Sequence, residues 1–262
     1  MARWPCREKL EELYRRLNRR CFVHPDPLEF LYQYEACKDR ELVALIASSL
    51  AYGRVNQILS SISKVLKEMG PHPAAFIRER SKRELEKTFS QFKHRFTTSR
   101  ELLSLLINAK EIEARHGSLF ECFKSHLKEE DETFLPALCG FTEELRQGLK
   151  KSSLLPDPRK GSASKRLNLL LRWMVRQDEV DPGCWQELGA HRLIVPLDTH
   201  MHKIGLELGL SKRRAADLKT ALEITSAFRK IEPEDPVRYD FALTRMGICS
   251  ELSLEDCCLL GN

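Results

Sequence analysis

The segment that decides the fold is residues 154–209, with the sequence LLPDPRKGSASKRLNLLLRWMVRQDEVDPGCWQELGAHRLIVPLDTHMHKIGLELG. It contains a loop of small residues at 161–164, where the backbone can turn tightly and approach another surface closely. The spacing of the apolar residues that follow predicts a helix that begins near Lys165. A second helix is predicted after Asp198, because aspartate is a favourable N-cap residue. We expect the rest of the chain to hold these two helix starts together.

Nearly every periodic segment outside this region is also predicted to be helical. In residues 7–20 the apolar side chains recur at the spacing of one helix face, and residues 39–52 are apolar almost all round, which is typical of a buried central helix. Aspartate followed by proline at 235–236 predicts the start of the last helix. No run alternates for long enough to predict a sheet. The sequence therefore predicts an all-α fold, with residues 1–262 forming a single two-lobed helical domain.

Composition narrows the class of protein. The chain has 262 residues, enough for a sizeable core, and a net charge of +5 that permits a polyanionic partner without requiring one. No apolar run approaches the length of a membrane span, and the N-terminal residues lack the apolar core of a signal peptide. The nine cysteines include no C-x-x-C pair, so no metal or iron–sulfur cluster is predicted. We expect a cytoplasmic monomer with no membrane association.

The loop before Lys165 has the features of an anion-binding site. A helix that starts there presents free backbone N–H groups and its positive dipole end, which together favour a phosphate. On this helix Lys165, Arg172 and Arg176 fall on the side opposite the leucines, which predicts a basic face. A basic face that is only solvated would show the same pattern. Lys165 itself is suited to Schiff-base chemistry once it has lost its proton.

Asp198 has two interpretations that do not exclude each other. It can cap a helix, and as an ionised carboxylate it could stabilise a developing positive charge or orient a proton acceptor. The nearby His200 and His202 could suggest a metal site. On a helix, however, positions i and i+2 point about 200° apart, so the two rings cannot bind one ion together. A metal-dependent hydrolase that uses these histidines remains one alternative.

The sequence GSASK at 161–165, followed by PLDTH at 196–200, resembles the helix-hairpin-helix DNA glycosylase superfamily. In that superfamily a G-x-G-x-K hairpin lysine precedes a V-D-T-H aspartate; here Ala163 replaces the second glycine. The wide separation of the lysine from the aspartate is similar to that of the archaeal 8-oxoguanine glycosylase branch. The four-cysteine C-terminal cluster of endonuclease III-like members is absent. Over nearly its whole length the chain also resembles a bacterial family of conserved proteins of unknown function.

This resemblance implies a two-lobed helical fold with the active-site cleft between the lobes. Residues 134–178 would form the helix-hairpin-helix, and residues 196–248 would supply the helix of the catalytic aspartate and the C-terminal helices. The implied activity is a DNA N-glycosylase with AP (apurinic/apyrimidinic) lyase activity, which removes an oxidised purine, 8-oxoguanine, from double-stranded DNA. It implies no cofactor other than a structural monovalent cation at the hairpin. The alternative from another class is a helix-hairpin-helix protein that binds DNA without catalysis.

The resemblance also indicates roles for individual residues. Lys165 would attack the sugar C1′ and Asp198 would stabilise the positive charge that develops there. The residues expected to contact DNA near the hairpin are Lys160, Gly161, Ser162, Ala163, Ser164, Arg166 and Arg172. Tyr52 and Arg54 are candidates for the wedge that fills the vacated base stack, although Tyr52 would equally suit the end of a buried helix. Candidates for stacking in the base pocket, all of residue types that are also common in cores, are Phe241, Trp173 and Trp185.

Overall fold

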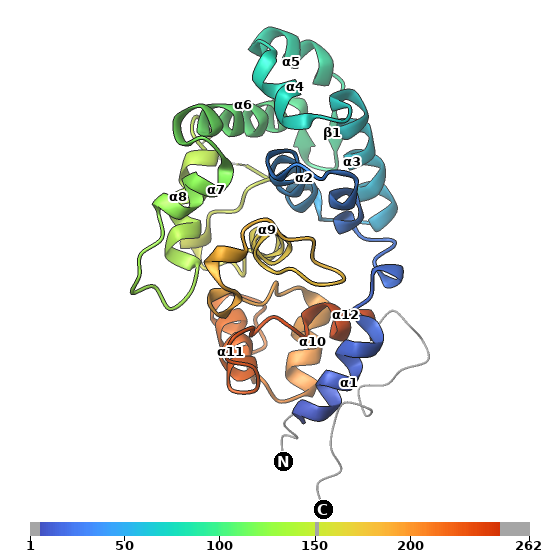
Figure 1. Ribbon diagram of the computed structural model, residues 1–262, viewed down its shortest axis with the longest axis vertical. Coiled ribbons are helices and arrows are strands. Elements are labelled where there is room, and N and C mark those ends of the chain that lie inside the picture. Colours follow the sequence, from blue (N-terminus) through green and yellow to red (C-terminus); the bar gives the residue numbers. More distant parts are fainter. Residues whose placement is uncertain (1–5, 150–151, 247–262) are drawn as a thin grey trace, which may run out of the picture. The chain divides into compact units, whose positions relative to one another are not determined.

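The computed structural model describes residues 6–149 and 152–246. These residues are mostly helical, which confirms the predicted all-α class (Figure 1). Within the described part of the chain, the regular strands are the two-residue β1 (Lys93–His94) and β2 (Thr97–Thr98), which pair antiparallel. Among the described helices, none combines the length and the apolar composition that crossing a membrane requires.

The described residues form two compact units. The central unit is residues 24–158, and the terminal unit consists of residues 6–23 together with residues 159–246. The boundary between them falls within residues 134–178, the segment predicted to form a helix-hairpin-helix. Each unit is therefore considered by itself.

Helix α2 forms the middle of the central unit. Its side chains from Leu42 to Ala47 are at most 2% exposed, as expected for a helix that is apolar all round. The helix runs over Cys37–Leu50 and contacts η2 (Pro27–Gln33), α3 (Val55–Met69), α4 (Pro73–Glu79) and α7 (Leu119–Ser125). The predicted buried helix at 39–52 is thus confirmed, with its observed end at Leu50.

The other helices of the central unit are α5 (Lys82–Phe89), α6 (Ser99–His116) and α8 (Leu135–Leu145). Capping boxes at Ser81 and Thr98 start α5 and α6, because each hydroxyl accepts from the backbone N–H three residues on and the glutamate there returns the bond. Helices α6, α7 and α8 pack against one another in pairs. Phe123 lies edge-on to Phe134 and Phe141 at this junction.

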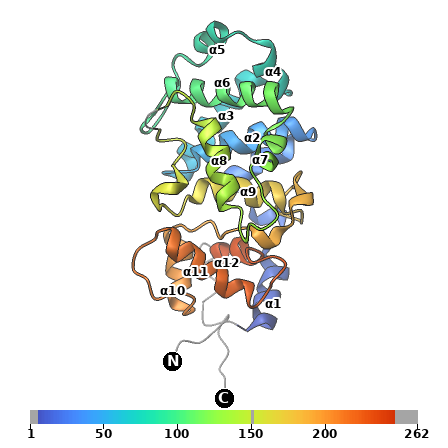
Figure 2. The ribbon, with the colours of Figure 1, turned by 90° about the vertical axis from the view of Figure 1, so that its left-hand side faces the viewer.

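The terminal unit brings together the two ends of the described chain. Its helices are α1 (Arg7–Leu17), α9 (Lys165–Val175), α10 (Thr199–Glu207), α11 (Leu218–Arg229) and α12 (Asp240–Met246). Helix α1 buries Leu10, Leu13 and Leu17, as its periodicity predicted, and lies beside α12 in both views (Figures 1 and 2). The predicted helix start at Asp235 is wrong, because α12 begins at Asp240.

The predicted basic face of α9 is also wrong in its second half. Arg172 and Arg176 are 4% and 5% exposed and are surrounded by carboxylates of the same unit. Arg172 donates to Asp181 over 3.2 Å and is also paired with Asp240. A helical wheel places side chains around the axis, but it does not show which sides the rest of the chain covers. Buried guanidinium groups must be paired, and these two are.

Arg176 joins three parts of the terminal unit. Its guanidinium pairs with Asp178 at 2.8 Å, with Asp235 at 2.9 Å, and with Asp181. Burial alone would lower the pKa of Arg176, but these aspartates raise it well above its ordinary value. The group therefore remains charged, and α9 is held to the chain that precedes α12.

We expect Arg176→Met to lower the free energy of unfolding by about 3–5 kcal/mol, because it leaves buried carboxylates without their countercharge. Denaturant-induced unfolding measures this change. Lys203→Met is the matched control, since the Lys203–Glu207 pair is exposed and its atoms lie 3.6 Å apart. The control should change the free energy by no more than about 0.5 kcal/mol. Equal effects of the two substitutions would contradict a structural role for the buried network.

Candidate functional site

The loop at 161–164 is held against the start of α11. Gly161 (φ +77°) and Ser164 (φ +47°, ψ +38°) adopt left-handed backbone conformations that turn the chain into α9. Ser162 forms an antiparallel bridge with Asp217, and the N–H of Leu218 donates to the Gly161 carbonyl over 3.0 Å. The Asn168 side chain donates to the Ala163 carbonyl over 3.0 Å. The loop is therefore a fixed feature of the terminal unit.

Lys165 and Asp198 meet at the starts of two helices. Lys165 is the first residue of α9, and its Nζ lies 3.0 Å from Oδ2 of Asp198. The lysine side chain is 35% exposed and the aspartate side chain 23%, so solvent reaches the pair. The sequence placed each residue at a helix start, and the structure brings the two into contact.

Asp198 uses its two carboxylate oxygens for different tasks. Oδ1 accepts from the N–H of Met201 over 2.8 Å, which caps α10, while Oδ2 faces Lys165. Burial opposes the charge on Asp198, but Lys165 and the Met201 N–H outweigh it and lower the pKa. The carboxylate is ionised at neutral pH, with one oxygen directed at the amine.

This arrangement suits proton transfer at an amine. A separation of 3.0 Å is within the range over which a positioned carboxylate can accept a proton or stabilise a cation. A lysine next to a general base is one recurring form of an activated nucleophile. The chemistry that the pair can support is therefore attack of Nζ on an electrophilic carbon, with Asp198 balancing the charge.

Asp240 is a further carboxylate whose role the sequence did not suggest. It begins α12, it is buried, and its Oδ1 has no hydrogen-bond partner among the described residues. Burial raises the pKa of Asp240 to about 6 against the opposing charge of Arg172, and the charge of Asp198 adds to the rise. Asp240 thus links the buried network electrostatically to the Lys165–Asp198 pair. The sequence signal that could have identified Asp240 is an aspartate in the otherwise apolar run DFAL.

The predicted DNA contacts near the hairpin differ in exposure. Lys160, Gly161 and Ser162 are exposed and Arg166 is half-buried. Ala163 and Ser164 are 6% and 3% exposed, so their side chains face the protein. Arg172 is buried in the ion-pair network, so the prediction that it contacts DNA on an exposed face is wrong.

The two wedge candidates lie in the central unit at the break between α2 and α3. The hydroxyl of Tyr52 donates to the carbonyl of His94 over 2.9 Å, and its ring meets the His94 ring edge-on at 4.7 Å. These contacts fit the interpretation of Tyr52 as a structural residue at the end of a buried helix. Arg54 is exposed at the N-cap of α3.

The three aromatic candidates for a base pocket are all buried. Phe241, Trp173 and Trp185 are 2%, 1% and 0% exposed. The guanidinium groups of Arg245 and Arg172 lie 4.9 Å and 5.8 Å from the centre of the Phe241 ring. None of the three rings is open to a ligand in this structure, so they are placed as core residues.

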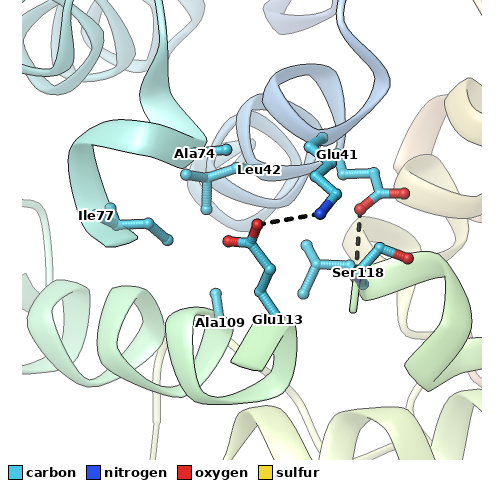
Figure 3. Close-up of a pocket in the computed structure, with 9 residues that line it drawn as sticks. Glu41, Leu42, Ala74, Ile77, Ala109, Glu113 and Ser118 are labelled. Atoms are coloured by element: carbon cyan, nitrogen blue, oxygen red, sulfur yellow. Dashed lines mark hydrogen bonds and ion pairs between the residues drawn. The ribbon is translucent and has the colours of Figure 1, made fainter. Parts of the chain in front are cut away.

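Neither of two hollows in the described part of the chain is lined by Lys165 or Asp198. One, of about 450 Å³, is lined by residues 209–213 and by Glu223, Ser226, Ala227 and Lys230 on and beside α11. The other is in the central unit between α2, α4 and α6, where the Lys38 amine lies 3.5 Å from the Glu113 carboxylate (Figure 3). There Glu41 accepts from the backbone N–H of Leu119 over 3.0 Å. The charged side chains Lys38, Glu41 and Glu113 at this second hollow are thus already paired with other groups that line it.

The two histidines considered for a metal site lie on α10, which is helical as the geometric argument required. His200 is exposed. His202 is half-buried, with Nε2 2.8 Å from the carbonyl oxygen of Arg213. The two rings therefore have different surroundings.

Comparison with known proteins gives one match. A family model described as "Protein of unknown function (DUF2400)" matches residues 26–249, which is most of the chain. No curated protein and no solved structure matches the chain significantly. The family covers both units and includes Lys165 and Asp198.

Replacing Asp198 by asparagine separates its charge from its capping role, because asparagine is an equally good N-cap. A lowered folded-state pKa means that the charge stabilises the protein above the ordinary aspartate value of about 3.9. This stabilisation is lost as the pH falls through the lowered pKa. We expect Asp198→Asn to lower the free energy of unfolding by about 1 kcal/mol near pH 7, and the difference to vanish in acid. Denaturant unfolding across this pH range measures it.

The matched background for this experiment is Lys165→Met. With the amine removed, the effect of Asp198→Asn near neutral pH should shrink, because the remaining Met201 bond is kept by asparagine. An undiminished effect in that background would contradict a direct interaction between the two charges.

Proposed function

The chain belongs to the DUF2400 family, and we propose that it is a DNA N-glycosylase with AP lyase activity. Its substrate would be double-stranded DNA with an oxidised purine, of which 8-oxoguanine is the first to test. The observation that carries the proposal is the 3.0 Å contact between Lys165 and Asp198 at two helix starts. A hairpin lysine followed by such an aspartate is the feature shared with the helix-hairpin-helix glycosylases. The fixed small-residue loop directly before Lys165 adds support.

The proposed reaction begins when the damaged base leaves the stack, at a cost of a few kcal/mol. Nζ of Lys165, after loss of its proton, attacks the sugar C1′, and the bond from C1′ to the base breaks. The base departs with the electron pair and takes up a proton. Asp198, 3.0 Å from Nζ, stabilises the positive charge that develops on the sugar and assists removal of the lysine proton.

The second half of the reaction cleaves the strand. The sugar ring opens to a Schiff base between Nζ and C1′, which acidifies the C2′ hydrogen. Loss of that proton expels the 3′ phosphate by β-elimination, and hydrolysis by water frees Lys165. The positive charge of the Schiff base lies next to the Asp198 carboxylate, which favours its formation.

Exposed cations near the loop support a DNA partner. Lys160 is exposed directly before Gly161, and the bridge from Ser162 to Asp217 brings the basic segment KRR at 212–214 to the same part of the unit. Lys212 and Arg214 are exposed, whereas Arg213 pairs with Asp217 at 2.7 Å. Loops of this kind bind phosphates through backbone N–H groups and flanking cations, and a monovalent cation at the hairpin would fit the same role.

Trapping the Schiff base tests the catalytic role of Lys165. We expect incubation with 8-oxoguanine duplex DNA and sodium borohydride to give a covalent protein–DNA adduct, because borohydride reduces the imine. Lys165→Ala should abolish the adduct. Lys203→Ala, which removes an exposed lysine of α10, should keep it. Asp198→Asn should slow base excision by about 100- to 10,000-fold under single-turnover conditions.

The outcome also decides between the two classes of function. An adduct that survives in Lys165→Ala would overturn the assignment of the nucleophile. DNA binding with no adduct and no excision, across duplexes that carry different oxidised bases or an abasic site, would leave a helix-hairpin-helix protein that binds DNA without catalysis.

Salt dependence tests the DNA-contacting surface separately from catalysis. We expect Lys160→Ala and Lys212→Ala each to reduce the slope of log K against log salt by about 1, because each removes one phosphate contact. Fluorescence anisotropy with a labelled duplex measures the affinity. Lys87→Ala, an exposed lysine on α5 of the central unit, should leave the slope unchanged. Equal slopes for all three variants would contradict the proposal that Lys160 and Lys212 contact the DNA phosphates.

A further inference from the structure

Metal-ligating side chains converge where three helices of the central unit meet. His116 ends α6, Cys122 lies on α7 and Glu144 lies near the end of α8. Their ligand atoms all lie within 4.8 Å of one another. The first and last of these residues, His116 and Glu144, are 28 positions apart in the sequence. None of the three takes part in the proposed DNA chemistry.

We propose that His116, Cys122 and Glu144 bind a zinc ion that fastens α6, α7 and α8 together. The proposal is independent of the glycosylase assignment, since every ligand belongs to the central unit and Lys165 and Asp198 belong to the terminal unit. The nitrogen, sulfur and oxygen donors form a mixed set that zinc accepts and that calcium and magnesium do not prefer.

The distances from the two Glu144 oxygens to the other two donors are close to those of a tetrahedral site. Ligand bonds of about 2.0–2.3 Å at tetrahedral angles place a nitrogen and an oxygen donor about 3.4 Å apart, and a sulfur and an oxygen donor about 3.6 Å apart. Nε2 of His116 lies 3.2 Å from Oε2 of Glu144, and Sγ of Cys122 lies 3.4 Å from Oε1. Small side-chain adjustments would bring all three donors to ligand distance.

Burial of the three donors suits an ion site that is closed on one side and open to solvent on the other. Cys122 is fully buried, whereas the side chains of Glu144 and His116 are 14% and 24% exposed. The ion would therefore have the thiol beneath it and a route to solvent past the histidine. His116, Cys122 and His126 all form hydrogen bonds with the Glu144 carboxylate, so its oxygens already face the other donors.

His126 supports the carboxylate from a second direction. Its Nε2 lies 2.8 Å from Oε1 of Glu144, and its ring fits against bare backbone at Gly140 of α8. A Cβ at Gly140 would lie 2.5 Å from Nδ1 of His126. Ligating carboxylates are commonly oriented by such outer hydrogen bonds. We assign His126 this positioning role.

Arg115 is the competing cation at the site. Its Nη2 lies 2.8 Å from Oε2 of Glu144, and its side chain is 46% exposed. Without a metal, Arg115, the two histidines and the Cys122 thiol all contact the Glu144 carboxylate. Zinc binding would displace the Cys122 proton and release Arg115 to solvent. A hydrogen-bonded cluster that never binds metal is the opposing outcome.

Metal analysis of the full-length chain tests the proposal. After removal of metals with a chelator, we expect the protein to take up one equivalent of zinc in a competition titration. Cys122→Ser should weaken binding by about 100-fold or more, and His126→Ala by about 10- to 100-fold, the range for loss of an outer hydrogen bond. Cys21→Ser is the matched control, since Cys21 is an exposed free thiol of the terminal unit, and it should bind zinc like the unaltered chain.

A second measurement keeps the test independent of stability. Cobalt(II) bound in place of zinc should give the absorption of a cobalt–thiolate bond, which Cys122→Ser removes and Cys21→Ser keeps. Glu144→Gln, which keeps the shape of the side chain, should also weaken zinc binding by at least tenfold. Less than stoichiometric zinc on the unaltered chain, or equal binding by the Cys122→Ser variant, would overturn the proposal.

Discussion

Pairing of buried charge is the constraint on which the terminal unit depends. Arg172 lies in the last turn of α9 and Arg176 caps its C-terminus, and both side chains are almost fully buried. Two guanidinium groups in such a place would be highly unfavourable without Asp181 and the other aspartates around them. Because these partners come from the loop after α9 and from the chain around the start of α12, the network fixes how α9 is seated. Along α9 the partly exposed residues are Lys165, Arg166 and Leu169, all in its N-terminal half.

The same constraint gives the candidate site its electrostatic character. Lys165 lowers the pKa of Asp198, while the Asp198 charge helps to raise that of Asp240. In the proposed reaction Lys165 loses its positive charge before it attacks. The repulsion between Asp198 and Asp240 would then no longer be offset by the lysine charge, and the pair of carboxylates would hold a proton more readily. In the proposed reaction, these carboxylates would be the acceptor for the proton that Lys165 has to lose.

Sequence patterns predicted those features that depend on neighbours along the chain. Helical periodicity identified α1 and the buried α2, and local chemistry placed helix starts at Lys165 and Asp198. The patterns failed where distant segments decide the environment. The helical wheel placed Arg172 on the side of α9 opposite the leucines. That side is nevertheless buried, because Asp181 and Asp240 pair with Arg172 there, and no local pattern could reveal these partners. The rings of Phe241, Trp173 and Trp185 are buried for the same reason.

Side chains that come together from separate helices are the clearest case that local sequence patterns cannot predict. His116, Cys122 and Glu144 have no motif spacing, since each stands on a different helix and only the packing of α6, α7 and α8 brings them together. Asp198 differs because its capping role is local, and aspartate at a helix start is readable from sequence even though its second partner is distant. A residue that serves both a local and a long-range requirement is constrained twice. Asparagine keeps the cap and loses the charge, alanine loses both, and only a short carboxylate at this backbone position meets the two demands together.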